Sequence, residues 1–195
     1  MQLRVDSGER ISLTEHREVL ILAESDGVTI TWSRYGPGER GPDPHVHREH
    51  LDAFYVLEGE LTFEVGPDAQ AIRLGQRGFA VVPANVVHSF VNASSAEARW
   101  LNFHAPDTGF AAYLRALRDG TDASFFDSFD PPADGGLPAS EVLVAGPGEG
   151  LKAALPELWV ADGGAALDGA PSGDRYTFHH AGDRADLTVG VVAPR

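Results

Sequence analysis

The sequence contains no cysteine and a single lysine, Lys152. Without cysteine the chain has no disulfides and no thiolate ligands, so any metal must be bound by histidine and carboxylate side chains. The other basic residues are arginines, and the formal net charge is -14. We therefore expect neither nucleic acid nor an anionic membrane surface as a partner, because no basic stripe is present to neutralise phosphates.

Long apolar runs are also missing from the sequence. No stretch approaches the roughly 18 apolar residues of a membrane span, and the first twenty residues lack the basic start and apolar centre of a signal peptide. A cytoplasmic location is the resulting expectation. The 195 residues have an ordinary apolar content of 43%. This is enough for one substantial core, or for one core with an appendage.

Short alternating apolar runs, separated by glycine and proline clusters, dominate the first hundred residues. Clear examples lie at 28–35 and 52–65, and the second is divided at Glu58 and Gly59, where a tight hairpin is expected. Helices between the runs, as a parallel sheet would need, are missing. The pattern therefore predicts an all-β antiparallel sandwich or barrel.

One helix is expected at about 107–119, with Asp107 or Thr108 as its cap. Three apolar residues fall at helical spacing on one face and are expected to pack against the barrel: Phe110, Leu114 and Leu117. From residue 121 the sequence becomes turn-rich. We expect two parts: residues 1–120 as a β-barrel with its following helix, and residues 121–195 as a linker and a tail of short strands that packs on the barrel or on a partner.

Histidines are crowded in the stretch PHVHREHLD, residues 44–52. His45 and His47 are two residues apart, so on an extended strand both imidazoles point to the same face and can converge on one ion. Asp52 opens the next strand, and its side chain shares a face with Phe54 and Val56. His50 is either a further ligand or a residue at the rim of a pocket.

Two motifs in this region resemble those of the cupin family. In the first, His45, His47, Asp52 and Gly59 fall at the spacing of G-x5-H-x-H-x(3,4)-E-x6-G, with aspartate in place of glutamate. In the second, roughly G-x5-P-x-G-x2-H-x3-N, the matching residues are Pro83, His88 and Asn92. Asn85 replaces the inner glycine, and asparagine tolerates a left-handed backbone better than most residues. Gly78 lies one residue closer to Pro83 than the pattern has it.

The resemblance covers about residues 25–105 and implies an antiparallel jelly-roll barrel with a metal inside. The metal ligands carried over are His45, His47, Asp52 and His88. Aspartate is one methylene shorter than glutamate, so either its backbone lies closer to the ion or the carboxylate is a weak or water-mediated ligand. Asn92 is expected to anchor its turn by hydrogen bonds to the backbone.

Three imidazoles and one carboxylate suit Fe, Mn, Ni or Co as divalent ions, and Zn at lower coordination. Such an ion keeps one or two positions open for water, dioxygen or a substrate oxygen. The expected pocket is mostly apolar and therefore suits a small organic molecule. Its predicted walls are Phe54, Val56, Phe63 and Phe90, with His104 on the last barrel strand.

The chain resembles small bacterial cupins related to quercetin dioxygenase, which implies a metal-dependent dioxygenase acting on a small phenolic or enolic compound. A non-catalytic binding or sensing module, which uses the metal to grip a ligand, is the alternative. No general base is assigned, although Asp52 could serve if it leaves the metal. Leu51, Tyr55 and Leu57 lie on the outer face, and because cupins commonly pair through such faces, a homodimer is expected.

Overall fold

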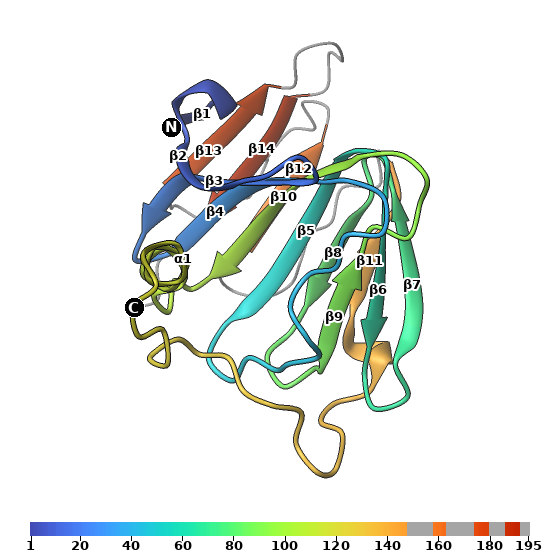
Figure 1. Cartoon of the computed structure of the whole chain (residues 1–195). Helices are drawn as coiled ribbons and strands as arrows, with labels where there is room; N and C mark the ends of the chain where they lie inside the picture. Colours follow the sequence, from blue (N-terminus) through green and yellow to red (C-terminus); the bar gives the residue numbers. More distant parts are fainter. Residues whose placement is uncertain (148–157, 163–173, 180–185, 192–195) are drawn as a thin grey trace.

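The computed structural model describes residues 1–147, 158–162, 174–179 and 186–191 (Figure 1). Within these residues there is one α-helix, α1 (Phe110–Asp119), and none is long and apolar enough to cross a membrane. The strands are β1 (Gln2–Leu3), β2 (Glu9–Leu13), β3 (Arg17–Ser25), β4 (Val28–Tyr35), β5 (Leu51–Glu58), β6 (Glu60–Val65), β7 (Gln70–Gly75), β8 (Phe79–Val82), β9 (His88–Val91), β10 (Ala98–Ala105), β11 (Leu143–Ala145), β12 (Leu158–Asp162), β13 (Asp174–His179) and β14 (Asp186–Val191).

Two antiparallel sheets form the barrel. The large sheet has seven strands in the order β11-β8-β5-β10-β4-β3-β2, and the small sheet has three in the order β7-β6-β9. Side chains from both sheets, including Phe54, Leu61, Phe63 and Trp100, form one buried cluster between them. The expected all-β jelly-roll fold with one helix is therefore confirmed.

Gly59 lies where the chain passes from the large sheet to the small one. The expected hairpin at this position is wrong, because β5 pairs with β10 and β8, whereas β6 pairs with β7 and β9. Gly59 has a φ of 76°, and an added Cβ would collide with the backbone of Glu97. A glycine is thus required at this corner, but for a change of sheet rather than for a two-residue turn.

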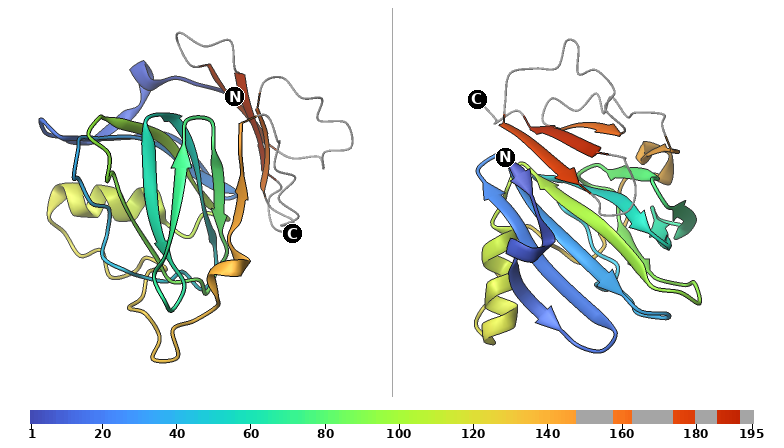
Figure 2. Two further views of the ribbon diagram at one scale, coloured as in Figure 1. Left: turned by 90° about the vertical axis from the view of Figure 1, so that its right-hand side faces the viewer. Right: turned by 90° about the horizontal axis from the view of Figure 1, so that it is seen from above.

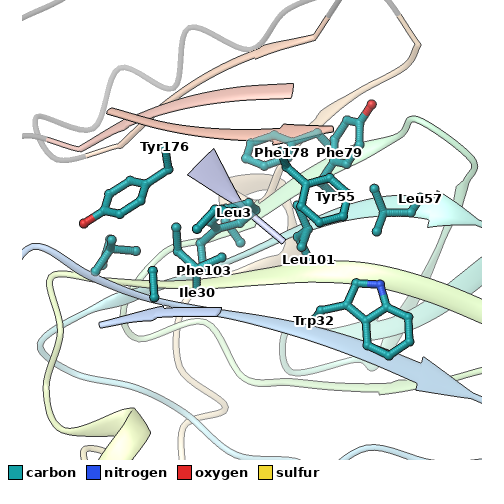
Figure 3. Close-up of a cluster of buried hydrophobic side chains, with 14 of the residues drawn as sticks. Leu3, Ile30, Trp32, Tyr55, Leu57, Phe79, Leu101, Phe103, Tyr176 and Phe178 are labelled. Atoms are coloured by element: carbon teal, nitrogen blue, oxygen red, sulfur yellow. The ribbon is translucent and has the colours of Figure 1, made fainter. Parts of the chain in front are cut away.

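A third sheet covers the outer face of the large sheet. Its four strands follow the order β1-β13-β14-β12, and Figure 2 shows it on the opposite side of the large sheet from α1. Tyr176 and Phe178 of β13 join Leu3 and the outward residues of the large sheet in a buried cluster (Figure 3). Strand β5 is therefore covered on both faces, which explains why it reads as a nearly continuous apolar run.

This cover removes the reason for expecting a homodimer. Leu51, Tyr55 and Leu57 were expected to present a free outer face, but they are only 5%, 3% and 4% exposed within the single chain. The side chains that cover this face come from β1 and β13 of the same chain. The remainder of the expected tail, residues 148–157, 163–173, 180–185 and 192–195, lies outside the described residues.

Helix α1 begins three residues later than expected, at Phe110. The carboxylate of Asp107 accepts hydrogen bonds from the backbone N–H groups of Gly109 and Phe110, both at 3.2 Å, and so satisfies two free donors of the first turn. Gly120 ends the helix in a left-handed conformation, with φ 66°. The buried helix residues are Ala111 and Ala116 rather than the larger apolar residues of the predicted stripe.

Candidate metal centre

The inner face of the large sheet, at its β2–β3–β4–β10 end, borders a cavity of about 430 Å³. Helix α1, Phe126 and Ser128 line the same cavity. Most lining side chains are apolar or aromatic, which is typical of a pocket for a small organic molecule. They include Ile11, Val19, Tyr35, Phe90, Trp100, Phe110, Tyr113, Leu114, Leu117 and Phe126. The polar lining residues include His45, His47, Asp52, Asn102 and His104.

His45 and His47 line this cavity, and His88, some forty residues farther along the chain, lies beside them. His45 and His88 form an antiparallel bridge, in which the N–H of each donates to the carbonyl of the other at 3.1 and 2.9 Å. One ring nitrogen from each of His45, His47 and His88 lies within 4.8 Å of the others. Ring nitrogens gathered this closely are candidate ligands for one ion, whose bonds to imidazole nitrogen are about 2.1 Å long.

The turn before β9 brings His88 to this place. Asn85 has a φ of 68°, the left-handed conformation that its replacement of glycine implied, and its N–H donates to the carbonyl of His47 at 2.7 Å. Asn92 lies at the other end of β9. Its side-chain amide donates to the carbonyls of Tyr35 and Gly36, both at 3.0 Å, so it anchors the backbone as expected and does not face the histidines.

The orientation of each imidazole is fixed by a backbone carbonyl. Nδ1 of His45 lies 2.9 Å from the carbonyl oxygen of Asp43. Nδ1 of His47 lies 2.5 Å from the carbonyl oxygen of Asp127, and Nδ1 of His88 lies 3.0 Å from that of Val86. A carbonyl only accepts, so Nδ1 carries a proton in all three rings, and Nε2 is the atom of each ring that can bind a metal when it carries no proton. This is the second contact that metal-binding histidines usually make.

The Nε2 atom of His47 is buried and has no hydrogen-bond partner. An orphaned buried acceptor is costly unless something fills its place. A divalent metal ion would accept this lone pair together with those of the two neighbouring rings. The donor set therefore fits a metal.

The carboxylate of Asp52 faces the same three rings. One of its oxygens, Oδ2, lies 3.4 Å from Nε2 of His88 and 3.9 Å from Nε2 of His47. The other, Oδ1, accepts a hydrogen bond from the amide of Asn102 and lies 3.4 Å from Nε2 of His104. The short aspartate arm thus reaches the histidine cluster because β5 itself passes close to it, with Asp52 paired to His104 across the sheet.

Burial and charge keep these groups in the protonation states that a metal requires. Burial, and secondly the charge of His88, lowers the pKa of His45 to about 4, and burial also lowers the pKa of His47. Burial alone would raise the pKa of Asp52, but its hydrogen bond and charge interaction with His88 outweigh this and lower it. At neutral pH His45 and His47 are therefore neutral and Asp52 is ionised, as metal ligation demands.

His50 is not at the rim of the pocket, because it is only 2% exposed. It belongs to a second group with His47 and His104, whose ligand atoms also lie within 4.8 Å of one another. Nδ1 of His50 lies 2.8 Å from the carboxylate of Asp127, and its Nε2 lies 2.9 Å from Nδ1 of His104. Nε2 of His104 in turn lies 2.9 Å from the side-chain oxygen of Asn102. Because every ring nitrogen of His50 and His104 has a protein partner, the trio of His45, His47 and His88 is the better metal site.

Two of the residues predicted to form the pocket wall line this cavity, and three do not. Phe90 and His104 line the cavity. Phe54, Val56 and Phe63 do not line it, and they are at most 1% exposed in the core between the two barrel sheets. They share the inward face with Asp52, but they lie farther along the barrel, where Phe54 packs on Phe63 with 4.7 Å between ring centroids.

The opposite wall comes from residues that sequence reasoning did not assign to the site. The ring of Phe110 stacks on His104 at a centroid distance of 3.5 Å, and Phe126 lies 5.6 Å from His47 and 4.7 Å from Tyr113. The helix stripe was expected to be only a packing surface, but Phe110, Leu114 and Leu117 all line the cavity. The run SFFDSFD (124–130) was a possible signal, since three phenylalanines within five positions of a turn-rich segment are unusual for a solvated linker.

Part of the chain matches a known protein family. Residues 31–104 match the cupin domain family. The chain is also 43% identical over 76 residues to quercetin 2,3-dioxygenase of Bacillus subtilis (strain 168), an alignment that spans 38% of this chain and 22% of that enzyme. The chain therefore covers only about a fifth of the length of this curated relative.

Two solved structures are similar to part of this chain. One is KdgF from Halomonas sp., and the other is a sugar phosphate isomerase from Silicibacter pomeroyi that is described as a cupin superfamily protein. The first is 19% identical with a TM-score of 0.48, and the match covers 55% of this chain and 94% of that one. The second is 25% identical with a TM-score of 0.46, and the match covers 54% of this chain and 76% of that one.

Proposed function

We propose that this chain, a protein of the cupin superfamily that resembles quercetin dioxygenase, is a metal-dependent dioxygenase acting on a small phenolic or enolic compound. The observation that carries the proposal is the convergence of ring nitrogens from His45, His47 and His88 close to an ionised Asp52, where His45, His47 and Asp52 line an aromatic cavity. When bound, a divalent Fe, Mn, Ni or Co ion supplies open positions and redox chemistry at this point.

The cavity favours an uncharged aromatic molecule. Two arginines line it, but each is already paired: Arg17 with Glu39 at 2.7 Å, and Arg118 with Glu9 at 2.8 Å. Asp52 is the one carboxylate among the described lining residues. A substrate that carries its own carboxylate or phosphate would therefore find no unpaired cation among the described lining residues, whereas a phenol or enol presents only one polar edge.

The aromatic walls orient such a substrate. Phe110, Tyr113 and Phe126 line one side, and Tyr35, Phe90 and Trp100 line the cavity from the barrel. Aromatic rings pack favourably in offset or edge-to-face contact, so a planar ring held between these walls points its hydroxyl edge at the polar cluster. Asp52 is kept ionised, so it could accept the hydroxyl proton at that edge if it leaves the metal.

The test combines elemental analysis of the purified protein with an oxygen electrode. We expect a redox-active metal and dioxygen consumption when catechol, a flavonol or another phenol or enol from a panel is added. Bound zinc without oxygen consumption, together with thermal stabilisation by the same compounds, would instead support the alternative of a non-catalytic binding or sensing module. The cytoplasmic location rests on the sequence alone. The sequence-based reason for a homodimer is removed by the cover over Leu51, Tyr55 and Leu57, and sedimentation at several concentrations measures the oligomeric state.

A further inference from the structure

Residues 126–129 lie outside the region that matches the cupin domain, yet they are bound directly to the histidine motif. Val46 and Phe129 form an antiparallel bridge, with N–H to carbonyl distances of 2.9 and 3.0 Å in the two directions. Phe126 is buried against His47 at a ring centroid distance of 5.6 Å. The segment therefore forms part of the wall behind the candidate ligands.

Asp127 makes most of the polar contacts in this segment. Its carboxylate accepts the backbone N–H of Arg48 at 3.1 Å and of Glu49 at 2.8 Å, and it lies 2.8 Å from Nδ1 of His50. Its own backbone carbonyl lies 2.5 Å from Nδ1 of His47. Asp127 thus binds the backbone directly after His47 through its side-chain carboxylate, and it contacts the His47 ring through its backbone carbonyl.

These contacts place Asp127 where a partner of a metal-ligating histidine is expected. For His45 and His88 the carbonyl that holds Nδ1 comes from two residues earlier in the same chain segment, Asp43 and Val86. For His47 it comes from eighty residues later, so local backbone geometry does not fix it. The carboxylate bonds to Arg48 and Glu49, together with the Val46–Phe129 bridge, hold this distant carbonyl beside the ring.

We propose that Asp127 is a positioning residue for the metal centre, which fixes the tautomer and the direction of His47 so that Nε2 faces the ion. This inference rests on the proposed metal site. Outer partners of this kind typically change metal affinity about 10- to 100-fold when they are removed. The role belongs to the segment that follows α1 and is an addition to the cupin domain.

Three variants test the proposal. Asp127→Ala removes every side-chain contact. Asp127→Asn keeps the shape but leaves one oxygen, so the amide must face one of the former donors. Asp130→Asn makes the same charge change at an exposed position three residues away and is the matched control.

The first readout is the dissociation constant for Co(II), measured by competition with a chelator, together with the visible absorption spectrum of the bound ion. We expect affinity about 10- to 100-fold weaker and an altered spectrum for Asp127→Ala. Asp127→Asn should be intermediate, and Asp130→Asn should match the unaltered protein. Unchanged affinity and an identical spectrum in folded Asp127→Asn would overturn the proposal, because a purely structural role would lower stability alone.

The second readout is nitrogen-15 NMR of the metal-free protein with labelled histidine. The Nδ1–H tautomer of His47 should be present in the unaltered protein and lost or mixed in the Asp127 variants. If the unaltered protein bound no Co(II), the proposed metal site would fail, and this measurement alone would decide the positioning role. The same His47 tautomer in all variants would contradict it.

Discussion

Acid should destabilise the metal-free protein through His45. The pKa of this imidazole is lowered from its usual 6.5 to about 4 in the folded chain, first by burial and then by the charge of His88. As the pH falls from neutrality, the unfolded chain binds a proton at His45 before the folded chain does, so the free energy of unfolding decreases. The loss begins near the unfolded pKa of 6.5 and levels off below the folded pKa of about 4.

The magnitude follows from the size of the shift. Each pKa unit corresponds to about 1.4 kcal/mol, so the full contribution of His45 is about 3 kcal/mol and about 2 kcal/mol of it is lost by pH 5. His47, His50 and His104 act in the same direction, because burial lowers their pKa values as well. Asp52 acts in the same direction, because its pKa is also lowered in the folded chain, but its contribution is lost only at more acidic pH, below its usual pKa of 3.8.

Urea denaturation of chelator-treated protein at pH 8, 6.5 and 5 measures this effect. The unaltered protein should lose about 2 kcal/mol more than His45→Gln between pH 8 and pH 5. Glutamine does not titrate, so the difference isolates the imidazole. Equal losses in the two proteins would refute the claim that His45 is held neutral by its surroundings.

Three further substitutions test the barrel core, the change of sheet at Gly59 and the cavity wall. Phe54→Ala should cost about 3–5 kcal/mol in urea denaturation while the metal content is kept, because Phe54 fills the core; loss of metal would place it in the site after all. Gly59→Ala should cost at least about 1–3 kcal/mol, since φ is 76° and the new Cβ meets the backbone of Glu97; an unchanged melting temperature would contradict that reading. Phe126→Ala should weaken catechol binding about tenfold in calorimetry, as expected for the loss of one aromatic contact; unchanged affinity would remove Phe126 from the binding wall.

The candidate ligands could be identified from the sequence because their signal is local. The spacing of His45 and His47 places both on one face of an extended segment, and the motif around His88 supplies the third ring. The left-handed conformation of Asn85 was likewise predictable from its residue type. Such signals depend on a few neighbouring positions, so they can be recognised without knowledge of the tertiary fold.

The pocket wall could not be located in the same way. Alternation along β5 correctly predicted that Phe54 and Val56 face inward with Asp52, but not how far along the barrel the cavity extends. Gly59 marked a sharp change of direction, and nothing in the residues beside it distinguished a hairpin from a passage between sheets. Phe178 packs in the buried cluster that contains Tyr55, and this packing depends on strand pairing between distant parts of the chain.

Asp127 was missed for a related reason. Its contact with His47 is made by a backbone carbonyl, which every residue carries, so the side-chain type gives no signal of it. The turn-rich composition around it instead favoured a linker. Contacts between residues eighty positions apart become visible only when the fold is known.

The claim that His45, His47, His88 and Asp52 hold a metal is tested most directly by the metal content of single-site variants. Elemental analysis of His47→Ala and His88→Ala, purified beside the unaltered protein and the exposed control His16→Ala, is the decisive measurement. We expect about one divalent ion per chain in the unaltered and control proteins, and almost none in the two variants. Full metal content in both His47→Ala and His88→Ala would contradict it.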